Sequence, residues 1–135
     1  MNGETNIGTL IASMSATLVE GLYVFATVPH DQQSLDIVPR MAFREAEGMT
    51  YILLKPEADS LDLEYDFPCR MITLNIHSSL EAVGFMARIA TELAKHDMGV
   101  NPVSGYFHDH LFVPDGRQGD AIKVLDELSK VSSSD

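Results

Sequence analysis

The sequence is poor in cysteine, and this excludes two kinds of stabilising site. Cys69 is the only cysteine among the 135 residues, so the chain cannot close an internal disulfide. A zinc site built from several thiolates is excluded for the same reason. A free cysteine packs as a small apolar side chain, and we expect Cys69 to be buried near the start of a strand.

The sequence is also poor in positive charge. Lys and Arg number 9 against 20 Asp and Glu, which gives a formal net charge of −11. Proteins that bind nucleic acid generally present a basic surface to the phosphates, and no cluster of Lys and Arg occurs here. Anionic membranes are disfavoured by the same charge. The composition therefore favours partners other than nucleic acid or membrane.

Long hydrophobic runs are missing from the start of the chain. The first residues, MNGETNIG, are polar and include Glu4, and the apolar run that follows is short. This pattern is unlike a signal peptide or a membrane anchor, so the expected location is the cytoplasm.

Signatures of common catalytic sites are missing as well. The sequence contains no nucleophile elbow, phosphate loop or dinucleotide-binding fingerprint, and no cofactor is expected. Glu45, Glu47, Glu57 and Asp59 lie near expected turns and lack the apolar surroundings that tune a catalytic carboxylate. An enzyme is therefore less favoured than a binding module.

The stretch from Cys69 to Asn101 carries the clearest structural pattern. Met71–Ile76 is a nearly continuous apolar run, typical of a covered strand. Ser78 stands three residues before Glu81, the spacing of a capping box, and predicts a helix that starts there and ends at Gly99. The apolar stripe predicted for this helix consists of Val83, Met86, Ala87, Ala90, Leu93 and Ala94.

Patterns elsewhere predict further elements on both sides of this stretch. Before it we expect a helix over Thr5–Met14, a strand over Leu22–Val28 after a break at Gly21, a polar connection over His30–Pro39, a hairpin over Met41–Leu54 that turns at Glu47-Gly48, a short helix over Pro56–Leu61 and an edge strand over Asp62–Asp66. After it we expect a hairpin over Val100–Val113 that turns at His108-Asp109, and a helix with an Asp115–Gln118 capping box.

The order of these elements predicts an α+β fold of the ferredoxin-like kind, with helices on one face of a mainly antiparallel mixed sheet. A doubly wound fold is disfavoured because only one long crossover helix is expected. The stretch AFREAEGMTYILLKPEAD can be laid over VSGYFHDHLFVPDGRQGD as hairpin, proline and helix start, which indicates a weak internal repeat. We expect a degenerate first half at residues 1–66, a second half at 67–131 and a frayed tail at 132–135.

The segment VGFMARIATELAKHDMGVNPV, residues 83–103, resembles the ACT domain superfamily. Val83-Gly84 stands where these domains often have Pro-Gly, Phe85-Met86 replaces a pair of leucines, and Gly99-Val100-Asn101 closes the motif. Together with HSSLEAVG and GYFHDHLFVP, the chain is similar to small uncharacterised bacterial proteins with tandem ACT-like halves. The resemblance implies a regulatory module that binds a small ligand, often an amino acid.

The same resemblance places a ligand at the loop between the central strand and helix. The residues it implies are His77, Ser78, Ser79, Gly84 and Asn101. Imidazole, hydroxyl and amide groups can bind a carboxylate, and free N–H groups at a helix N-terminus favour an anion. The simpler interpretation is that these side chains only cap the helix and the sheet edge.

Two alternatives and one assembly state stay open at this stage. The chain could be a structural or protein-interaction domain that has the fold without a ligand. A weaker alternative is a metal-assisted enzyme that uses His108 and His110, although two histidines fall short of a full zinc ligand set. A homodimer is expected, because ACT-like sheets often join across subunits.

Overall fold

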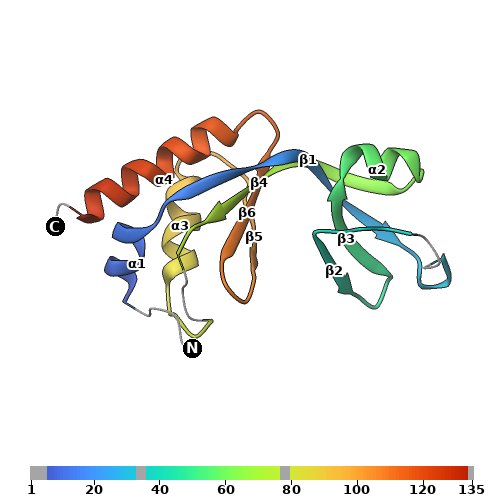
Figure 1. Ribbon diagram of the computed structural model, residues 1–135, viewed down its shortest axis with the longest axis horizontal. Coiled ribbons are helices and arrows are strands. Elements are labelled where there is room, and N and C mark those ends of the chain that lie inside the picture. Colours follow the sequence, from blue (N-terminus) through green and yellow to red (C-terminus); the bar gives the residue numbers. More distant parts are fainter. Residues whose placement is uncertain (1–5, 33–35, 77–79, 134–135) are drawn as a thin grey trace. The chain divides into compact units, whose positions relative to one another are not determined.

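The structure is a computed structural model that describes residues 6–32, 36–76 and 80–133 (Figure 1). Its elements, in chain order, are α1 (Ile7–Ser13), β1 (Ala16–Val28), the 3-10 turn η1 (His30–Gln32), β2 (Met41–Arg44), β3 (Met49–Leu54), α2 (Lys55–Ser60), β4 (Glu64–Leu74), α3 (Phe85–Ala94), β5 (Asn101–Ser104), β6 (Asp109–Pro114) and α4 (Gln118–Ser133). The hydrogen-bonded strand order is β2-β3-β1-β4-β6-β5. The fold is α+β and ferredoxin-like, as the sequence predicts.

The chain divides into two compact units. Residues 1–20 and 70–135 form unit 1, and residues 21–69 form unit 2. The boundaries between the units fall inside β1 and β4, so each of these two strands has one part in unit 1 and one part in unit 2.

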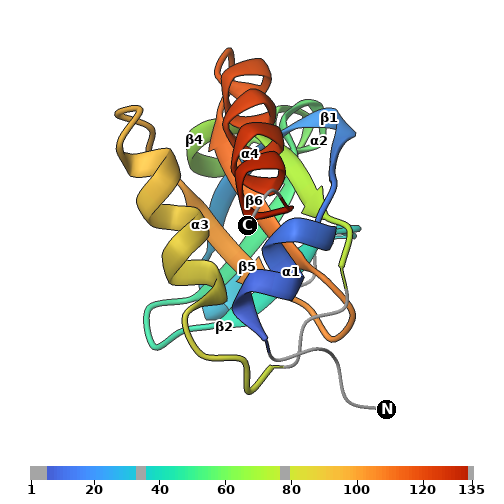
Figure 2. The ribbon, with the colours of Figure 1, turned by 90° about the vertical axis from the view of Figure 1, so that its left-hand side faces the viewer.

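Unit 1 packs a layer of helices against one face of its strands. Figure 2 shows α1, α3 and α4 together in front of β5 and β6. The core between the layers is apolar and fully closed to water at its centre; its larger members are Leu10, Ile11, Ile72, Leu74, Ile89, Leu93, Leu111 and Leu125. Burial of such side chains is worth about 1.5–3 kcal/mol each, so this core is the main stabilising feature of unit 1.

Unit 2 is built on a hairpin and a short helix. Strands β2 and β3 pair antiparallel, and β3 pairs antiparallel with β1, with Tyr23 opposite Leu54 and Val28 opposite Met49. The small core consists of Val24, Ala26, Leu53 and Ala58, which comes from α2. Since α2 has six residues, it depends on this packing more than on its intrinsic helix propensity.

Several elements confirm the predictions from the sequence. The first helix, the single turn after β1, the first hairpin and the short helix α2 all occur where they are expected. Asn6, and not Thr5, caps α1 by accepting a hydrogen bond from the Thr9 N–H at 2.9 Å. Cys69 is buried as expected, with its thiol 3.5 Å from the Tyr23 carbonyl oxygen, but it lies in the interior of β4 and not near the start of the strand. Across the described ranges, no helix is long and apolar enough to cross a membrane.

The two long strands differ from the prediction. Gly21 does not break the first strand, which begins at Ala16 and continues through it. The segment Asp62–Asp66 was expected to pair as an edge strand, and among the strands of unit 2 the β4 part that begins at Glu64 is indeed outermost, next to β1. The difference is one of length, because β4 continues without a break to Leu74. In this first part of β4, the exposed Glu64 and Asp66 alternate with the half-buried Tyr65.

The central helix is shorter than predicted. It begins at Phe85, so the capping box of Ser78 and Glu81 is wrong, and Leu80–Gly84 forms turns and bends. The buried stripe is Phe85, Ile89 and Leu93, at steps of four residues, whereas Val83 is 85% exposed. Gly99 does not end the helix. Lys95 is its C-cap, and Asp97 takes the positive φ that was predicted for the glycine.

The C-terminal hairpin and helix also shift by a few residues. The turn between β5 and β6 is Gly105–His108, closed by a 2.9 Å hydrogen bond from the Gly105 N–H to the His108 carbonyl, and not His108-Asp109. Asp115 does not cap α4, which begins at Gln118; it binds the Arg70 guanidinium at 2.8 Å instead. Helix α4 extends to Ser133, into the segment expected to be a frayed tail.

The turn of the first hairpin leaves no room for a side chain at Gly48. A β-carbon there would lie 2.7 Å from the Val28 carbonyl oxygen, which is backbone and cannot rotate away. We therefore expect Gly48→Ala to lower the free energy of unfolding by about 1–3 kcal/mol. Gly119→Ala is the matched control, because a β-carbon at this helical position meets nothing within 4 Å. It should leave stability unchanged or raise it by up to about 1 kcal/mol. Urea unfolding of both variants checks the contrast, and equal midpoints would contradict it.

Candidate functional site

The end of β4 and the tip of the β5–β6 hairpin lie side by side in unit 1. The His108 Nδ1 atom lies 3.3 Å from the Ile76 carbonyl oxygen, and the His110 Nδ1 atom lies 3.0 Å from the Thr73 hydroxyl. Two histidines of β6 and its turn are therefore fixed against β4. These contacts place the hairpin tip next to the point where the loop toward α3 leaves the sheet.

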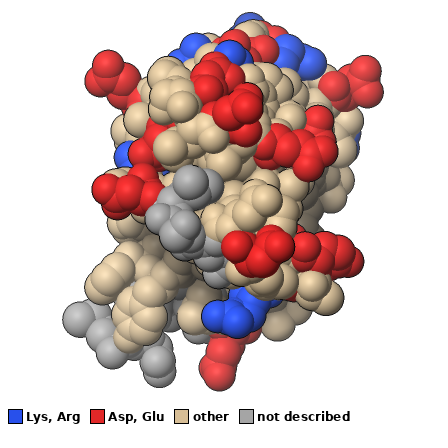
Figure 3. All heavy atoms as spheres, turned by 90° about the vertical axis from the view of Figure 1, so that its right-hand side faces the viewer, with Lys and Arg blue, Asp and Glu red and all other residues tan. Residues whose placement is uncertain are grey.

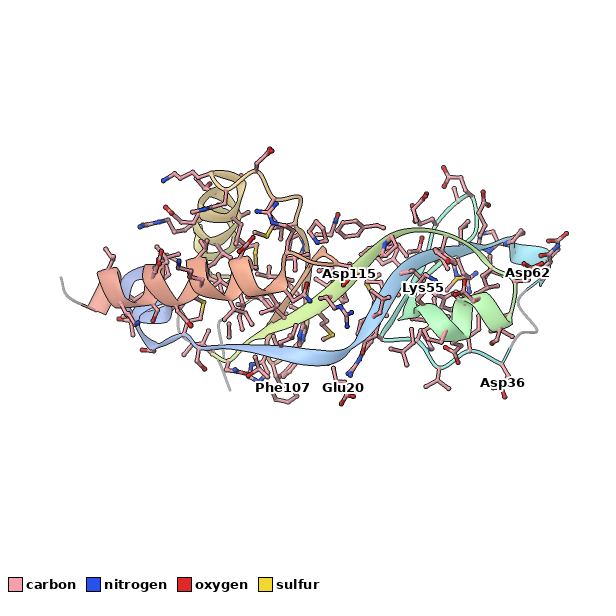
Figure 4. The ribbon with its side chains drawn as sticks, turned by 90° about the horizontal axis from the view of Figure 1, so that it is seen from above. Glu20, Asp36, Lys55, Asp62, Phe107 and Asp115 are labelled. Atoms are coloured by element: carbon pink, nitrogen blue, oxygen red, sulfur yellow. The ribbon has the colours of Figure 1, made fainter. Side chains whose placement is uncertain are left out.

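An exposed aromatic pair sits on this hairpin tip. Tyr106 and Phe107 are 68% and 64% exposed, and their rings make an edge-to-face contact with centroids 5.0 Å apart. Figure 4 labels Phe107, which points away from the ribbon. The sequence prediction did not include this pair, because Phe107 was expected inside a strand. Ser104-Gly105, a typical turn dipeptide, is the signal that could have located the turn and exposed the two rings.

Gly84 lies at the N-terminus of α3, as the N-cap residue. It was expected to allow close backbone approach, but a β-carbon there would meet nothing within 4 Å. Its role is conformational: its φ is 88°, which a residue with a side chain rarely adopts. No described side chain caps the helix, and the first intrahelical bond is donated by the Arg88 N–H to the Gly84 carbonyl at 3.0 Å. The N–H groups of Phe85–Ala87 therefore have no acceptor within the helix, as is usual for a first helical turn.

The other predicted loop residues, His77, Ser78 and Ser79, lie outside the described residues. Both flanks of this loop are described. Ile76 before it is held at the hairpin tip by His108, and Leu80 after it is 68% exposed. The described chain resumes at Leu80 and leads to the N-terminus of α3.

Asn101 is not at the end of the sheet where the hairpin tip and the last residues of β4 lie. It pairs with Phe112, while Ser104 at the other end of β5 pairs with Asp109, next to the tip that contacts Ile76. Parallel strands joined by a crossover helix run in the same direction and begin at the same end of the sheet. The start of β5 therefore lies at the end of the sheet opposite to the end of β4. At about 3.3 Å per residue, Asn101 is about 10 Å from the near end of its own strand. The expectation that Asn101 lies beside the loop within one chain is wrong.

The histidines do not form a metal centre with their neighbours. His108 and His110 are oriented toward Ile76 and Thr73, and Asp109 between them is buried and alternates to the other face of the strand. Among the described residues, no group of three or more His, Cys, Asp or Glu side chains is close enough to hold a metal ion.

The acidic residues near turns make local contacts. The Thr50 hydroxyl donates to the Glu45 carboxylate, while Asp59 binds Lys55 at 2.9 Å and accepts from the Tyr65 hydroxyl at 2.7 Å. The hydrogen bond from Lys55, followed by that from Tyr65, lowers the pKa of the Asp59 carboxyl. The same contact raises the pKa of Lys55. Because the Asp59 pKa is lowered on folding, its contribution to stability is present at neutral pH and is lost as the pH falls through that pKa.

The surface agrees with the net charge of the chain. On the face drawn in Figure 3, acidic side chains are spread over most of the surface and basic side chains gather in a few places. In a chain with 20 acidic and 9 basic residues, the first-turn N–H groups of α3 add positive partial charge.

Comparison with known proteins defines the family. Two models of the ACT domain match the chain in tandem, one over residues 2–70 and one over residues 66–127. A solved structure of a Vibrio cholerae protein of unknown function is 41% identical, with a TM-score of 0.79, over 90% of this chain and 94% of that chain. The chain belongs to the ACT domain family. A search of curated proteins gives no match.

More distant structures share the fold. A protein from Agrobacterium tumefaciens is 15% identical with a TM-score of 0.68, over 86% of this chain and 89% of that chain. An aspartate kinase from Clostridium acetobutylicum is 11% identical with a TM-score of 0.63, over 93% of this chain and 36% of the kinase. At these identities the likeness shows a common fold and nothing about ligands.

The conformation of Gly84 gives a direct test of how α3 begins. Gly84→Ala must adopt a positive φ, and we expect the free energy of unfolding to fall by about 1 kcal/mol. Gly84→Asn should cost less, because asparagine tolerates the left-handed region better than alanine does. Chemical denaturation of the two variants and the wild type measures the order. If alanine proves as stable as glycine, the residue does not have the conformation described.

Proposed function

We propose that this protein is a regulatory module that binds a small carboxylate-bearing ligand, an amino acid or a close relative. Membership of the ACT domain family supports the regulatory role, since ACT domains are generally ligand-binding regulators. The observation that carries the proposal is the N-terminus of α3: a ten-residue helix with no cap from any described side chain, in a chain of net charge −11. Uncapped N–H groups and the helix dipole together stabilise a carboxylate.

The proposed ligand site consists of the loop residues His77, Ser78 and Ser79 with Gly84. In this proposal the carboxylate accepts hydrogen bonds from the first-turn N–H groups, and the loop side chains add donors. Asn101 of the same chain lies at the other end of strand β5, away from the loop. A ligand that contacts all five residues would therefore have to bridge two copies of the chain, with Asn101 supplied by the second copy.

A homodimer follows from this arrangement and is part of the proposal, as is a division of the chain into a degenerate half at residues 1–66 and a second half at 67–131. The two matched ACT regions meet at residues 66–70, which supports that division. We further propose a cytoplasmic location, where free amino acids are available to a regulator. The module acts by binding, without catalysis.

One alternative has an observation of its own. The exposed pair Tyr106 and Phe107 at the hairpin tip is typical of surfaces that contact other proteins. An interaction domain without a small ligand would use such a surface. A thermal-shift panel of the twenty amino acids separates the two, because a ligand that binds only the native state raises the melting temperature.

The ligand site is tested with variants of the loop. For the amino acid that gives the largest thermal shift, Ser79→Ala should weaken binding by about 0.5–1.5 kcal/mol, because one hydrogen bond to the carboxylate is lost. His77→Ala and Asn101→Ala should also weaken it. Calorimetric titration measures the affinities, and Ser129→Ala is the control, because its hydroxyl contacts the Ala12 and Met14 carbonyls far from the loop in sequence. Equal affinities in all three loop and strand variants and the wild type would place the site elsewhere.

The role of Asn101 predicts that ligand binding and self-association are linked. A ligand shared by two copies should raise the dimer fraction by mass action. Light scattering at high micromolar protein should give twice the 14.8 kDa mass of one chain, and Asn101→Ala should weaken the effect of ligand on the dimer fraction. A mass of one chain with and without saturating ligand would contradict the dimer.

A further inference from the structure

A concave site lies on the helical layer of unit 1, lined by none of the loop residues described above. It has a volume of about 330 Å³ and is lined by His96, Arg117, Asp120, Lys123, Val124 and Glu127. His96 follows the C-terminal end of α3, and the other residues belong to the start of α4 or directly precede it. The volume is at the lower end of the range for small-molecule sites, which favours a small ligand.

Arg117 builds the wall of this cavity. Its Nη2 donates to the His96 carbonyl at 3.0 Å, and its Nε lies 3.1 Å from the Asp120 carboxylate. Its backbone N–H donates to the Pro114 carbonyl at 3.0 Å. These contacts tie the residue after α3 to the first turn of α4, and they hold the guanidinium in place through its Nη2 and Nε atoms.

Three polar side chains of the cavity are uncommitted. Within the described part of the chain, no hydrogen bond or ion pair is made by the His96 imidazole, the Lys123 ammonium or the Glu127 carboxylate. Lys123 and Glu127 are separated by one helical turn and flank Val124, which is 7% exposed. The cavity thus offers a donor group and an acceptor group on either side of an apolar surface.

The charges around the cavity cancel. Arg117 and Lys123 are positive, while Asp120 and Glu127 are negative. A phosphate or a dicarboxylate would meet both acidic side chains, and a polyamine would meet both basic ones. A molecule that carries one charge of each sign, a short distance apart, matches the arrangement best.

We propose that this cavity binds the zwitterionic group of an α-amino acid. The carboxylate of the ligand contacts Lys123 and His96, its ammonium contacts Glu127, and an apolar side chain packs on Val124. None of these residues belongs to the loop site, so the inference is independent of the proposed function and adds a second place for the same class of ligand. The contacts are near the surface, so the expected dissociation constant is about 1 mM.

The test is an amide-resolved NMR titration of the full chain with three isosteric probes. L-Valine carries both charges, isovalerate lacks the ammonium, and isobutylamine lacks the carboxylate. We expect L-valine to shift the amides of His96 and Lys123–Glu127 in a saturable manner. The two other probes should bind at least about fivefold more weakly, because each leaves one charged side chain without a partner.

Matched variants assign the effect to the cavity. Lys123→Gln and Glu127→Gln should each weaken L-valine binding by about fivefold or more, while Lys130→Gln and Asp126→Asn, on the same helix but outside the cavity, should leave it unchanged. The amide spectrum of each variant reports that the fold is intact.

The outcomes that overturn the inference are distinct from failure of the loop site. Because the contacts are to groups that every α-amino acid has, absence of a saturable shift with L-valine up to about 50 mM overturns the inference. Shifts confined to Leu80–Arg88 would support the loop site and overturn the cavity. Shifts at the cavity that persist in Lys123→Gln and Glu127→Gln would also overturn it.

Discussion

The crossover from β4 through α3 to β5 is the constraint on which the rest of unit 1 depends. The helix returns the chain to the edge of the sheet where β4 enters unit 1, so β4 and β5 run parallel and β6 fills the place between them. The buried stripe Phe85, Ile89 and Leu93 holds α3 on the sheet, because these side chains enter the core with Ile72 and Leu111. Because of this geometry, the N-terminus of α3 lies at the end of the sheet where the hairpin tip is, and Asn101 lies at the opposite end.

The net negative charge of the chain limits where a carboxylate ligand could bind. In a chain with 20 acidic and 9 basic residues, a carboxylate ligand is repelled by most of the surface. The start of α3 is a place where backbone N–H groups, and not side chains, supply positive partial charge. The cavity at the start of α4 is a different solution, since side chains of both signs are arranged around one apolar residue. In the two proposals, the same class of molecule is bound by different groups.

The sequence was sufficient for the fold because the core elements carry strong periodic patterns. The strand over Leu22–Val28, the turn at Glu47-Gly48 and the helix over Thr5–Met14 were predicted and occur. It failed where a local motif competed with tertiary packing. Ser78 and Glu81 have the spacing of a capping box, yet Gly84 takes a positive φ that a right-handed helix cannot contain, so the helix begins after it. Spacing alone could not show this, because the phase of the stripe is set by the contacts of Phe85 and Ile89 in the core.

The candidate site was predicted less well than the fold. Gly84 was identified for the wrong reason, and Asn101 was placed at the wrong edge although the predicted crossover already implied its position. Tyr106 and Phe107 were missed because a shift of the turn by a few residues converts strand positions into exposed ones. The contact between His108 and Ile76 could not be read from the sequence at all, since it joins residues from separate elements.

The most direct test of the account is residue-resolved detection of ligand at the start of α3. Amide chemical shifts of Phe85, Met86 and Ala87 should be recorded while each of the twenty amino acids is added to the full chain. The account predicts that at least one of them shifts these amides saturably and downfield, as expected for N–H groups that donate to a bound carboxylate. If every amino acid leaves the amides of Leu80–Arg88 unchanged, the central claim that this helix N-terminus is an amino-acid site is contradicted.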